Sequence, residues 1–461
     1  MINFYDIAYG LGVAAASPYW LIKPSTRRKV LAAFSQRMGD IARRESDQPA
    51  ILIHAVSLGE INATPALVDR LLRHRPDLQI IISTTTQTGF DRGGQLYGNR
   101  RGVVLIRFPL DFSAAVNRVL DALRPSLVVL MELEVWPNFM RQCEQRNIPV
   151  ILANGRLTGS SFKKYRLAKP LISGMFRRLT RVCAQDETYA ARFGALGVPA
   201  ERVLITGTMK FDTAQVSDTV EGDRTLAWAM GLRQAEPGTE PVWVCGSTGP
   251  GEEKIILEEY RKLLASFRRL RLVIVPRKPE RFDEVANLIQ QYKFIPLRRS
   301  ANQPPPMNLP IPPVILGDTM GELRKFYSIA DVVFVGRSLA DLGSRQHGSD
   351  MIEPAALAKP VIVGPYTGNF DQAMRALRAA DAVMEVHNGP AMAQAVRVLI
   401  STPAEAAAMG RRAQAVVQQQ QGATERHVNV ILEQLEANVA RISVPSPGTP
   451  GEGQGEGSGE P

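Results

Sequence analysis

Short apolar runs rich in β-branched residues alternate along the chain with amphipathic stretches of helical periodicity. The runs predict two sets of strands, at 50–56, 79–83, 103–107, 126–131 and 149–153, and at 241–245, 270–276, 313–316, 331–335 and 360–364. Amphipathic segments such as 61–73 and 113–123 lie between strands of the first set. Near-continuous apolar strands separated by helices are typical of parallel sheets covered on both faces. The pattern predicts an α/β protein of two doubly wound, Rossmann-like domains facing across a cleft.

The polar and low-complexity stretches set the boundaries of these domains. Residues 213–240 are polar and carry no strand pattern, 403–437 predict one or two closing helices, and the last 16 residues are rich in Gly, Pro and Glu. A segment of that last kind cannot build a core. We therefore divide the chain into an N-terminal apolar and basic segment (1–30), a first domain (31–215), a linker (216–239), a second domain (240–440) and a disordered tail (441–461).

The N-terminal segment reads INFYDIAYGLGVAAASPYWLI over residues 2–22 and is followed by a basic cluster at 23–29. A signal peptide would carry its positive charge before the apolar run, and a membrane-spanning helix would tolerate Asp6 poorly. We expect a helix in the membrane interface, with its basic residues on anionic headgroups at the cytoplasmic side. A buried amphipathic helix and a true span are the alternatives.

Composition excludes several classes of protein. The 461 residues are 45% hydrophobic and 22% charged, which is globular and excludes a mainly disordered, collagen-like or polytopic membrane protein. The net charge of +10 suits an anionic partner. We expect no nucleic-acid partner, because no Lys/Arg stripe with interleaved aromatic residues is present. Three scattered Cys and five unpaired His favour neither a disulfide framework nor a metal site.

Acidic residues follow two predicted strands of the first domain. Glu60 comes after strand 50–56, at the start of the next helix, where the helix dipole stabilises a carboxylate. Glu132 and Glu134 follow strand 126–131 and, at i and i+2, are expected on the same face. Carboxylates that converge from different strand ends are typical of acid/base catalysis. A helix-start acid and solvated loop acids are the structural alternatives.

The second domain carries a basic turn and a glycine-rich turn at strand ends. The turn from Pro276 to Arg281 suits a phosphate or a carboxylate, or is a solvated basic loop. The small residues between Gly246 and Glu253 would let backbone N–H groups approach an anion at a helix N-terminus. This stretch matches neither the Walker A pattern nor G-x-G-x-x-G. The chain contains no Asp-x-Asp pair, which argues against a metal-bridged nucleotide-sugar site.

Taken together, these motifs resemble the 3-deoxy-D-manno-octulosonic acid (Kdo) transferases of lipid A assembly, which are glycosyltransferases of the two-domain GT-B architecture. The resemblance covers about residues 30–430. Ten motifs occur in the order that the family has: IHAVSLGE (53–60), STTTQTG (83–89), ELEVWPN (132–138), ANGRL (153–157), GTMKFD (207–212), GSTGPGEE (246–253), VPRKPERF (275–282), DTMGEL (318–323), ADVVFVGRSL (330–339) and IEPAALAKPVIVGPYTGNF (352–370).

The resemblance implies transfer of Kdo from CMP-Kdo to a hydroxyl of a lipid A precursor, with inversion, without a cofactor or a catalytic metal, at the cytoplasmic face of the inner membrane. Glu60 matches the catalytic base, and Glu132 and Lys210 match residues that stabilise the transition state. Lys210 would pair with the Kdo carboxylate or the departing phosphate, and Glu353 with a ribose diol. The positions that match the CMP-binding residues are Pro276, Arg277, Met320, Gly321, Glu322, Asp350, Met351, Ile352 and Glu353.

Three positions depart from the family pattern near the nucleotide. Lys278 and Gly249 stand where the family usually has His, and Asp350 stands where it usually has Asn. We therefore expect a CMP pocket that is recognisable but remodelled. The alternatives are a GT-B glycosyltransferase or an epimerase that uses another nucleotide sugar, and a non-catalytic basic protein that binds a membrane.

Overall fold

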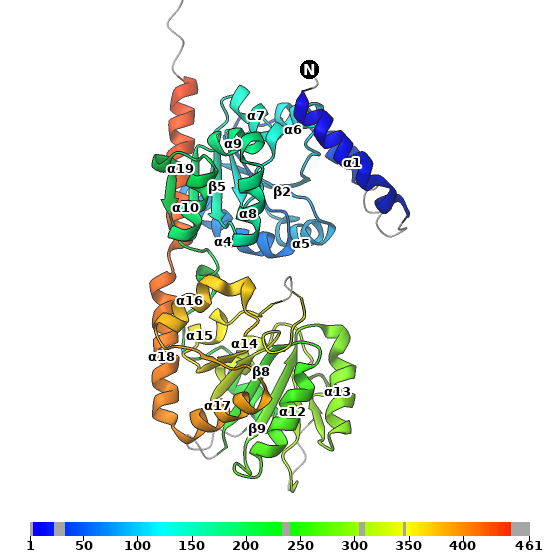
Figure 1. Ribbon diagram of the computed structural model, residues 1–461, viewed down its shortest axis with the longest axis vertical. Helices are drawn as coiled ribbons and strands as arrows, with labels where there is room; N and C mark the ends of the chain where they lie inside the picture. Colours follow the sequence, from blue (N-terminus) through cyan, green and yellow to red (C-terminus); the bar gives the residue numbers. More distant parts are fainter. Residues whose placement is uncertain (1–2, 23–32, 233–239, 304–308, 344–346, 444–461) are drawn as a thin grey trace, which may run out of the picture. The chain divides into compact units, whose positions relative to one another are not determined.

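The structure is a computed structural model that describes residues 3–22, 33–232, 240–303, 309–343 and 347–443 (Figure 1). It divides into two compact units, each described here by itself. Unit 1 comprises Met1–Thr213 and Gly422–Pro461, and unit 2 comprises Ala214–Gln421. Each unit contains one seven-stranded sheet, and all strand pairs in both sheets are parallel. The predicted pair of doubly wound parallel sheets is confirmed.

The sheet of unit 1 has the order β3-β2-β1-β4-β5-β6-β7. Its strands are β1 (Ala50–His54), β2 (Gln79–Thr84), β3 (Val103–Arg107), β4 (Leu127–Met131), β5 (Val150–Gly155), β6 (Arg181–Ala184) and β7 (Val203–Ile205). Its helices are α1 (Phe4–Ile22), α3 (Phe34–Arg37), α4 (Leu58–His74), α5 (Gln87–Tyr97), α6 (Ser113–Leu123), α7 (Pro137–Gln145), α8 (Gly159–Leu167), α9 (Lys169–Arg177), α10 (Glu187–Leu196) and α19 (Ala423–Ser443), with short 3₁₀ turns η1 (Ala200–Arg202) and η2 (Phe211–Thr213).

The sheet of unit 2 has the order β10-β11-β9-β8-β12-β13-β14. Its strands are β8 (Val242–Thr248), β9 (Arg271–Pro276), β10 (Pro296–Arg298), β11 (Val314–Leu316), β12 (Val332–Val335), β13 (Val361–Val363) and β14 (Met384–Glu385). Its helices are α11 (Asp223–Ala229), α12 (Glu252–Leu263), α13 (Phe282–Gln291), α14 (Leu323–Ser328), α15 (Ile352–Ala356), α16 (Asp371–Ala379), α17 (Gly389–Ser401) and α18 (Pro403–Gln420), with 3₁₀ turns η3 (Pro279–Arg281), η4 (Arg299–Ala301) and η5 (Gly368–Phe370).

Each predicted strand is present with ends that differ by up to three residues. The sequence pattern missed β6, β7, β10 and β14, which have only two to four residues each. Three of them contain a charged residue, so they lack the continuous apolar run that marks the equally short β11 and β13. They form because their backbone groups make hydrogen bonds with a neighbouring strand. The local sequence does not show that such a neighbour is present.

The predicted domain boundaries are wrong at two places. The polar stretch 216–239 was expected to be a linker, but α11 lies within unit 2. Residues 422–440 were assigned to the second domain, but α19 belongs to unit 1. The reason is apolar burial, because Val428, Ile431 and Leu435 on α19 are fully buried in the core that covers one face of the unit 1 sheet.

Polar contacts hold α19 at the same place. The buried imidazole of His427 accepts a hydrogen bond from the backbone N–H of Asn154 at 2.8 Å and lies 3.2 Å from the hydroxyl of Thr206. The carboxylate of Asp212 accepts hydrogen bonds from the backbone N–H groups of Gly422 and Thr424. Because the first N–H groups of a helix have no partner within the helix, Asp212 caps α19.

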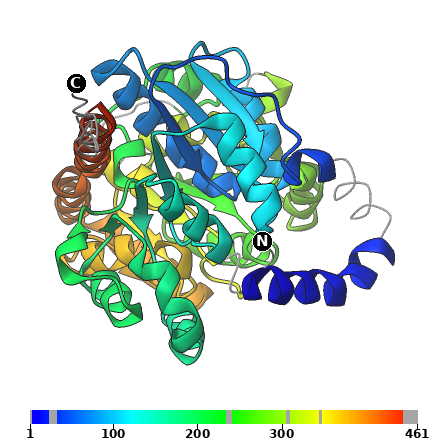
Figure 2. The same ribbon diagram turned by 90° about the horizontal axis from the view of Figure 1, so that it is seen from above.

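The first turns of α1 join the rest of unit 1 through polar contacts. Asn3 donates to Ser113 and to Asn138 at 2.8 Å each, and Asp6 accepts from the backbone N–H of Ser113 at 2.7 Å. The later part of α1 stands away from the sheet in both views (Figures 1 and 2). The described apolar side chains of Phe4, Ile7 and Leu11 are exposed, so the alternative of a buried helix is wrong for this part of α1. No helix among the described residues has the length and apolar character needed to span a bilayer.

Candidate active site

The order of the unit 1 sheet reverses between β1 and β4, which pair in parallel. In open α/β sheets this reversal leaves a crevice beyond the carboxyl ends of the strands, where ligands bind. Glu60 and Glu132 come from the connections that leave these two strands. The structure therefore places the two predicted acids at the position where this fold binds its ligands.

Glu60 lies in the first turn of α4, as the sequence predicted, and a local hydrogen-bond network fixes its carboxylate. The Oγ of Ser57, the N-cap residue, accepts from the backbone N–H of Glu60 at 3.3 Å, and the Ser57 hydroxyl donates to Oε1 of Glu60 at 2.8 Å. The backbone N–H of Val56 donates to Oε2 at 2.9 Å. This reciprocal arrangement is close to a capping box, so the helix start holds the carboxylate in one orientation.

Glu132 and Glu134 lie close to Glu60, but not for the reason that the sequence suggested. β4 ends at Met131, and Glu132 has a left-handed backbone with φ of +56°, so the two-residue periodicity of a strand does not apply. The backbone of Glu132 is held by β5 and its following loop, because its N–H donates to Ala153 and its carbonyl accepts from Arg156. A left-handed conformation in a non-glycine residue is costly and is typical of functional sites.

Three carboxylates in a partly buried place alter one another's protonation. Burial and the negative charges of Glu132 and Glu134 together raise the pKa of Glu60 to about 7, against the opposing effect of the hydrogen bonds from Val56 and Ser57. Burial also raises the pKa of Glu134, whose carboxylate accepts a hydrogen bond from Trp136 at 3.1 Å. Glu60 is thus a carboxylate that both holds and releases a proton near neutral pH.

Lys210 follows Met209, whose backbone N–H donates to the side-chain oxygen of Asn154 at 3.2 Å. Asn154 is the penultimate residue of β5, which pairs with β4, and it has a left-handed backbone with φ of +52°. The strand that neighbours Glu132 therefore also positions the loop that carries Lys210. This role of Asn154 could not be predicted from the local sequence, because its backbone N–H donates to the distant His427.

In unit 2, Arg277, Asp350 and Glu353 form a cluster at the carboxyl ends of the central strands. Burial and the charge of Asp350 raise the pKa of Glu353 to about 7, against the opposing effect of the charges of Arg324 and Arg277. The sequence missed Tyr327, a buried residue whose hydroxyl has no hydrogen-bond partner in the described part of the chain. The charges of Glu353, Asp350 and Arg277 all act on its pKa, so it belongs to the same cluster.

The other predicted nucleotide-binding residues differ in accessibility. The side chain of Met320 is 70% exposed and Gly321 has φ of +84°, whereas Glu322 forms an ion pair with Arg299 at 3.0 Å. Met351 and Ile352 are almost completely buried, as is Pro276. These three could contact a nucleotide only through the main chain, so their predicted role rests on backbone groups.

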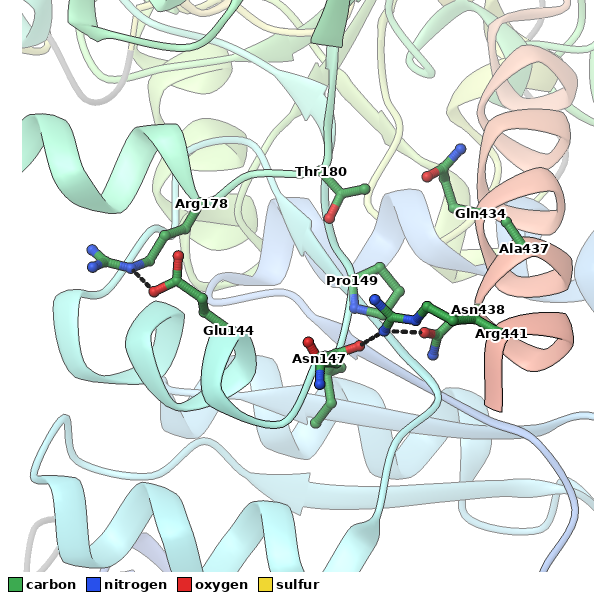
Figure 3. A pocket seen from close by; sticks show the side chains of 10 residues that line it. Glu144, Asn147, Pro149, Arg178, Thr180, Gln434, Ala437, Asn438 and Arg441 are labelled. Carbon is green, nitrogen blue, oxygen red and sulfur yellow. Dashed lines mark hydrogen bonds and ion pairs between the residues drawn. The ribbon is translucent and has the colours of Figure 1, made fainter. Parts of the chain in front are cut away.

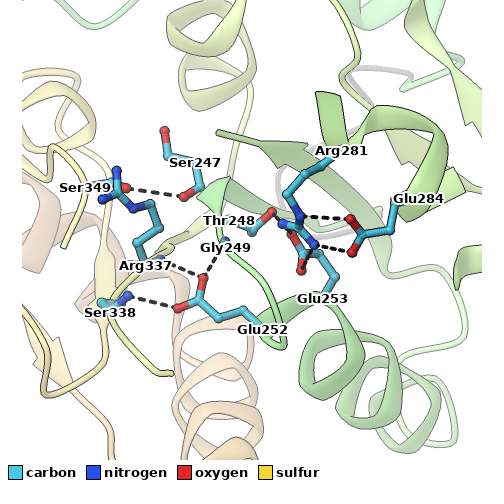
Figure 4. Close-up of polar contacts among 10 residues, drawn as sticks. All are labelled: Ser247, Thr248, Gly249, Glu252, Glu253, Arg281, Glu284, Arg337, Ser338 and Ser349. Atoms are coloured by element: carbon cyan, nitrogen blue, oxygen red, sulfur yellow. Dashed lines mark hydrogen bonds and ion pairs between the residues drawn. The ribbon is translucent and has the colours of Figure 1, made fainter. Parts of the chain in front are cut away.

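The glycine-rich turn after β8 differs from the expectation in an important respect. Its N–H groups were predicted to be available to an anion, but the buried carboxylate of Glu252 already accepts from Gly249 at 2.8 Å (Figure 4). The same carboxylate accepts from the backbone N–H groups of Arg337, Ser338 and Leu339 at 2.6, 2.9 and 2.9 Å. The protein itself thus supplies the anion that this turn binds.

A cavity of about 350 Å³ lies elsewhere in unit 1, at the amino ends of β5 and β6 beside α19 (Figure 3). Its charged groups are engaged, since Arg178 pairs with Glu144 at 2.6 Å and Arg441 donates to the carbonyl of Asn147 at 2.8 Å. It lies at the opposite end of the strands from Glu60 and Glu132. We therefore assign it no part in the site.

The chain is similar in sequence to proteins of one enzyme family. A family model described as "3-Deoxy-D-manno-octulosonic-acid transferase (kdotransferase)" matches residues 32–213. The 3-deoxy-D-manno-octulosonic acid transferase of Haemophilus influenzae is 37% identical over 390 residues, covering 84% of this chain and 88% of that protein. The chain belongs to the Kdo transferase family. The Kdo transferase of Bordetella pertussis is 34% identical over 391 residues, covering 84% of this chain and 87% of that protein.

Membership of the Kdo transferase family confirms the resemblance and the expected enzyme class, a glycosyltransferase. The fold agrees, because a solved glycosyltransferase from Rickettsia africae superposes with a TM-score of 0.55 at 14% identity, covering 85% of this chain and all of that one. The segment that matches the Kdo transferase model contains Glu60, Glu132 and Lys210. The individual roles of these residues remain predictions.

Proposed function

We propose that the protein transfers Kdo from CMP-Kdo to a hydroxyl of a lipid A precursor, with Glu60 of unit 1 as the base and unit 2 binding the donor. The observation that carries the proposal is the carboxylate of Glu60, which Val56 and Ser57 hold at the switch point of the unit 1 sheet. Burial and the neighbouring carboxylates raise its pKa to about 7. A general base is most effective when its pKa is near the working pH.

In the proposed reaction the acceptor hydroxyl loses its proton to the carboxylate of Glu60 as its oxygen bonds to the anomeric carbon of Kdo. The bond between that carbon and the phosphate oxygen breaks, and CMP leaves with the electron pair. Cationic groups must receive the charge that develops on the leaving phosphate. Arg277 supplies such a charge in unit 2, and Lys210 is assigned to the Kdo carboxylate or the same phosphate.

The function is tested by incubating the purified protein with CMP-Kdo and a tetraacylated lipid A precursor and weighing the lipid by mass spectrometry. We expect a lipid heavier by one or more Kdo residues and release of CMP. An unmodified lipid, together with binding of UDP in preference to CMP, would replace this proposal with an enzyme acting on another nucleotide sugar.

We also propose that a surface of unit 1, formed by one face of α1 together with α8 and α9, rests on an acidic membrane. Phe4, Ile7 and Leu11 are 66%, 58% and 67% exposed and share a helical face. The hydroxyl of Tyr5 donates to the carbonyl of Leu171 at 3.1 Å, which joins α1 to α9. The neighbouring exposed residues are apolar or basic: Lys163, Lys164, Arg166, Leu167, Lys169 and Leu171. Apolar residues flanked by Lys and Arg are typical of interfacial binding.

Replacing Phe4, Ile7 and Leu11 together by Ser is expected to weaken binding to vesicles of phosphatidylglycerol and phosphatidylethanolamine by at least about 10-fold. Three partly inserted apolar side chains supply on the order of a few kcal/mol, at up to about 1.5–3 kcal/mol for each fully buried one. Cosedimentation with the vesicles measures this change.

The matched control replaces three exposed apolar residues of unit 2, namely Trp228, Ile295 and Ile311. This control should bind vesicles like the unaltered protein. Equal loss of binding in the two triple variants would reject the assignment of the surface to α1, α8 and α9.

A further inference from the structure

Arg337 lies at the switch point of the unit 2 sheet, where the strand order reverses between β8 and β12. The backbone N–H of Gly336 donates to the carbonyl of Gly246 at 2.8 Å, and that of Arg277 donates to the carbonyl of Thr248 at 3.1 Å. The end of β8 is thus bonded to the segment that carries Arg337 on one side and to Arg277 on the other. Neighbouring strands lie about 4.8 Å apart, so two arginine side chains separated by one strand can reach the same ligand.

Arg277 and Arg337 are two cations at this edge whose side chains are not engaged in ion pairs within the described residues. Within the described residues neither Arg277 nor Arg337 forms an ion pair or a side-chain hydrogen bond, whereas three other arginines beside these strand ends each pair with a carboxylate: Arg281, Arg298 and Arg299. Burial and the positive charge of Arg277 lower the pKa of Arg337, and the negative charge of Glu252 acts in the opposite direction. An anion bound between two guanidinium groups is favoured, because it offsets the repulsion between their positive charges.

The main chain around Arg337 leaves little else for an anion to bind. The N–H groups of Gly249, Arg337, Ser338 and Leu339 are already taken by the carboxylate of Glu252. Figure 4 shows the side chain of Arg337 leading away from Glu252. An anion at this edge would therefore be bound by positively charged side chains.

The Arg337 side chain occupies space beside a glycine, and its own backbone is strained. A Cβ on Gly249 would lie 2.9 Å from Cγ of Arg337 and 2.6 Å from Cδ1 of Leu342, so a larger residue there would displace these two side chains. Arg337 itself has φ of +58°, a conformation that glycine adopts more easily than any other residue. A side chain kept in a strained backbone position, beside a glycine that gives it space, is typical of a functional residue.

We propose that Arg337 is a second arginine of the donor site, which binds an anionic oxygen of the donor substrate together with Arg277. This inference rests on the proposed function. The anionic group is the phosphate of the nucleotide or the carboxylate of the sugar, which a guanidinium group binds by the same paired hydrogen bonds.

The test replaces Arg337 by Gly, which removes the side chain while it retains the backbone N–H to Glu252 and relieves the positive φ. We therefore expect a thermal unfolding temperature equal to or above that of the unaltered protein. The matched control is Lys293→Gly, which removes one positive charge from another residue with positive φ, at the exposed end of α13. Arg337→Met tests the side chain without the added freedom of glycine.

Binding of CMP and of cytidine is measured by titration calorimetry, and the KM for CMP-Kdo is measured in the transfer assay. Loss of one charged contact is expected to weaken the interaction by about 10- to 100-fold, since such hydrogen bonds contribute about 1.5–3 kcal/mol. Weaker CMP binding with unchanged cytidine binding assigns Arg337 to the phosphate. Unchanged CMP binding with a raised KM for CMP-Kdo assigns it to the sugar carboxylate.

Unchanged CMP binding and unchanged KM in both Arg337 variants would overturn the inference, as would equal losses in Lys293→Gly. These outcomes differ from failure of the proposed function, in which the unaltered protein itself would bind neither CMP nor CMP-Kdo. A large fall in the unfolding temperature of both Arg337 variants would also overturn the inference, because it would mark Arg337 as a structural residue.

Discussion

Replacing Glu60 by Gln is expected to lower kcat by about 10²- to 10⁴-fold, the usual contribution of a general base. Gln has nearly the same shape, and its oxygen still accepts the hydrogen bond that Val56 donates to the carboxylate at 2.9 Å. The variant should therefore fold and bind CMP normally, because it lacks only the group that takes the proton. Turnover of CMP-Kdo at saturating donor and acceptor measures the loss.

The matched control for Glu60 is Glu134→Gln, which removes a carboxylate from the same cluster without removing the base. It should retain most of the activity and shift the pH profile, because the charge of Glu134 is one of the causes that raise the pKa of Glu60. Turnover by Glu60→Gln equal to that of the unaltered protein would contradict the assignment of the base.

The pKa of Glu60 also fixes the expected dependence on pH. The base acts only when ionised, so kcat should fall about 10-fold for each pH unit below about 7. Glu132→Gln removes the neighbouring negative charge and should move this fall to lower pH, even though the rate itself decreases. An acid limb that stays in place in Glu132→Gln would show that another group titrates.

The same carboxylate reduces the stability of the fold. The pKa of Glu60 is about 7 in the folded chain and about 4.5 for an ordinary glutamate, so the folded state binds the proton more tightly. Stability is lost as pH rises from about 4.5 to 7 and stays low above that range. Glu60→Gln should therefore stabilise the fold at pH 8 by on the order of 3 kcal/mol and leave it unchanged at pH 4, as measured by calorimetry.

Replacing Glu252 by Gln is expected to destabilise unit 2 by about 3–5 kcal/mol, which is the cost of disrupting a buried charged group. Each carboxylate oxygen of Glu252 accepts hydrogen bonds from two backbone N–H groups. A proton on either oxygen would face these donors and would find no acceptor. Gln would place an NH₂ group against two of these donors. Although burial raises the pKa of Glu252, the four N–H groups act against this and favour the ionised form.

Calorimetry measures this change as a fall of roughly 10 °C in the unfolding temperature of unit 2, since about 1 kcal/mol corresponds to about 2–4 °C for a domain of this size. The matched control is Glu258→Gln, an exposed residue on the same helix, where a change within about 0.5 kcal/mol is expected. A Glu252→Gln variant as stable as the control would show that the carboxyl is protonated in the fold.

The sequence predicted the parts of this protein that depend on local pattern. Strands of four or more apolar residues and the helix-start position of Glu60 follow from periodicity and capping, which neighbouring residues determine. The left-handed backbone of Glu132 could not be predicted in this way, because contacts with Ala153 and Arg156 impose it. The occupied turn after β8 was missed for the same reason, since three of its four donors to Glu252 lie more than 80 residues away.

The return of α19 to unit 1 affects the order in which a newly made chain can fold. Ribosomes usually release domains that fold in turn from the N-terminus. Here residues 214–421 form an uninterrupted unit, whereas the core of unit 1 lacks Val428, Ile431 and Leu435 until the last helix has been made. Unit 1 is therefore completed only after unit 2 has been synthesised, and until then the part of its sheet that α19 covers is exposed, while α4 covers another part of the same face.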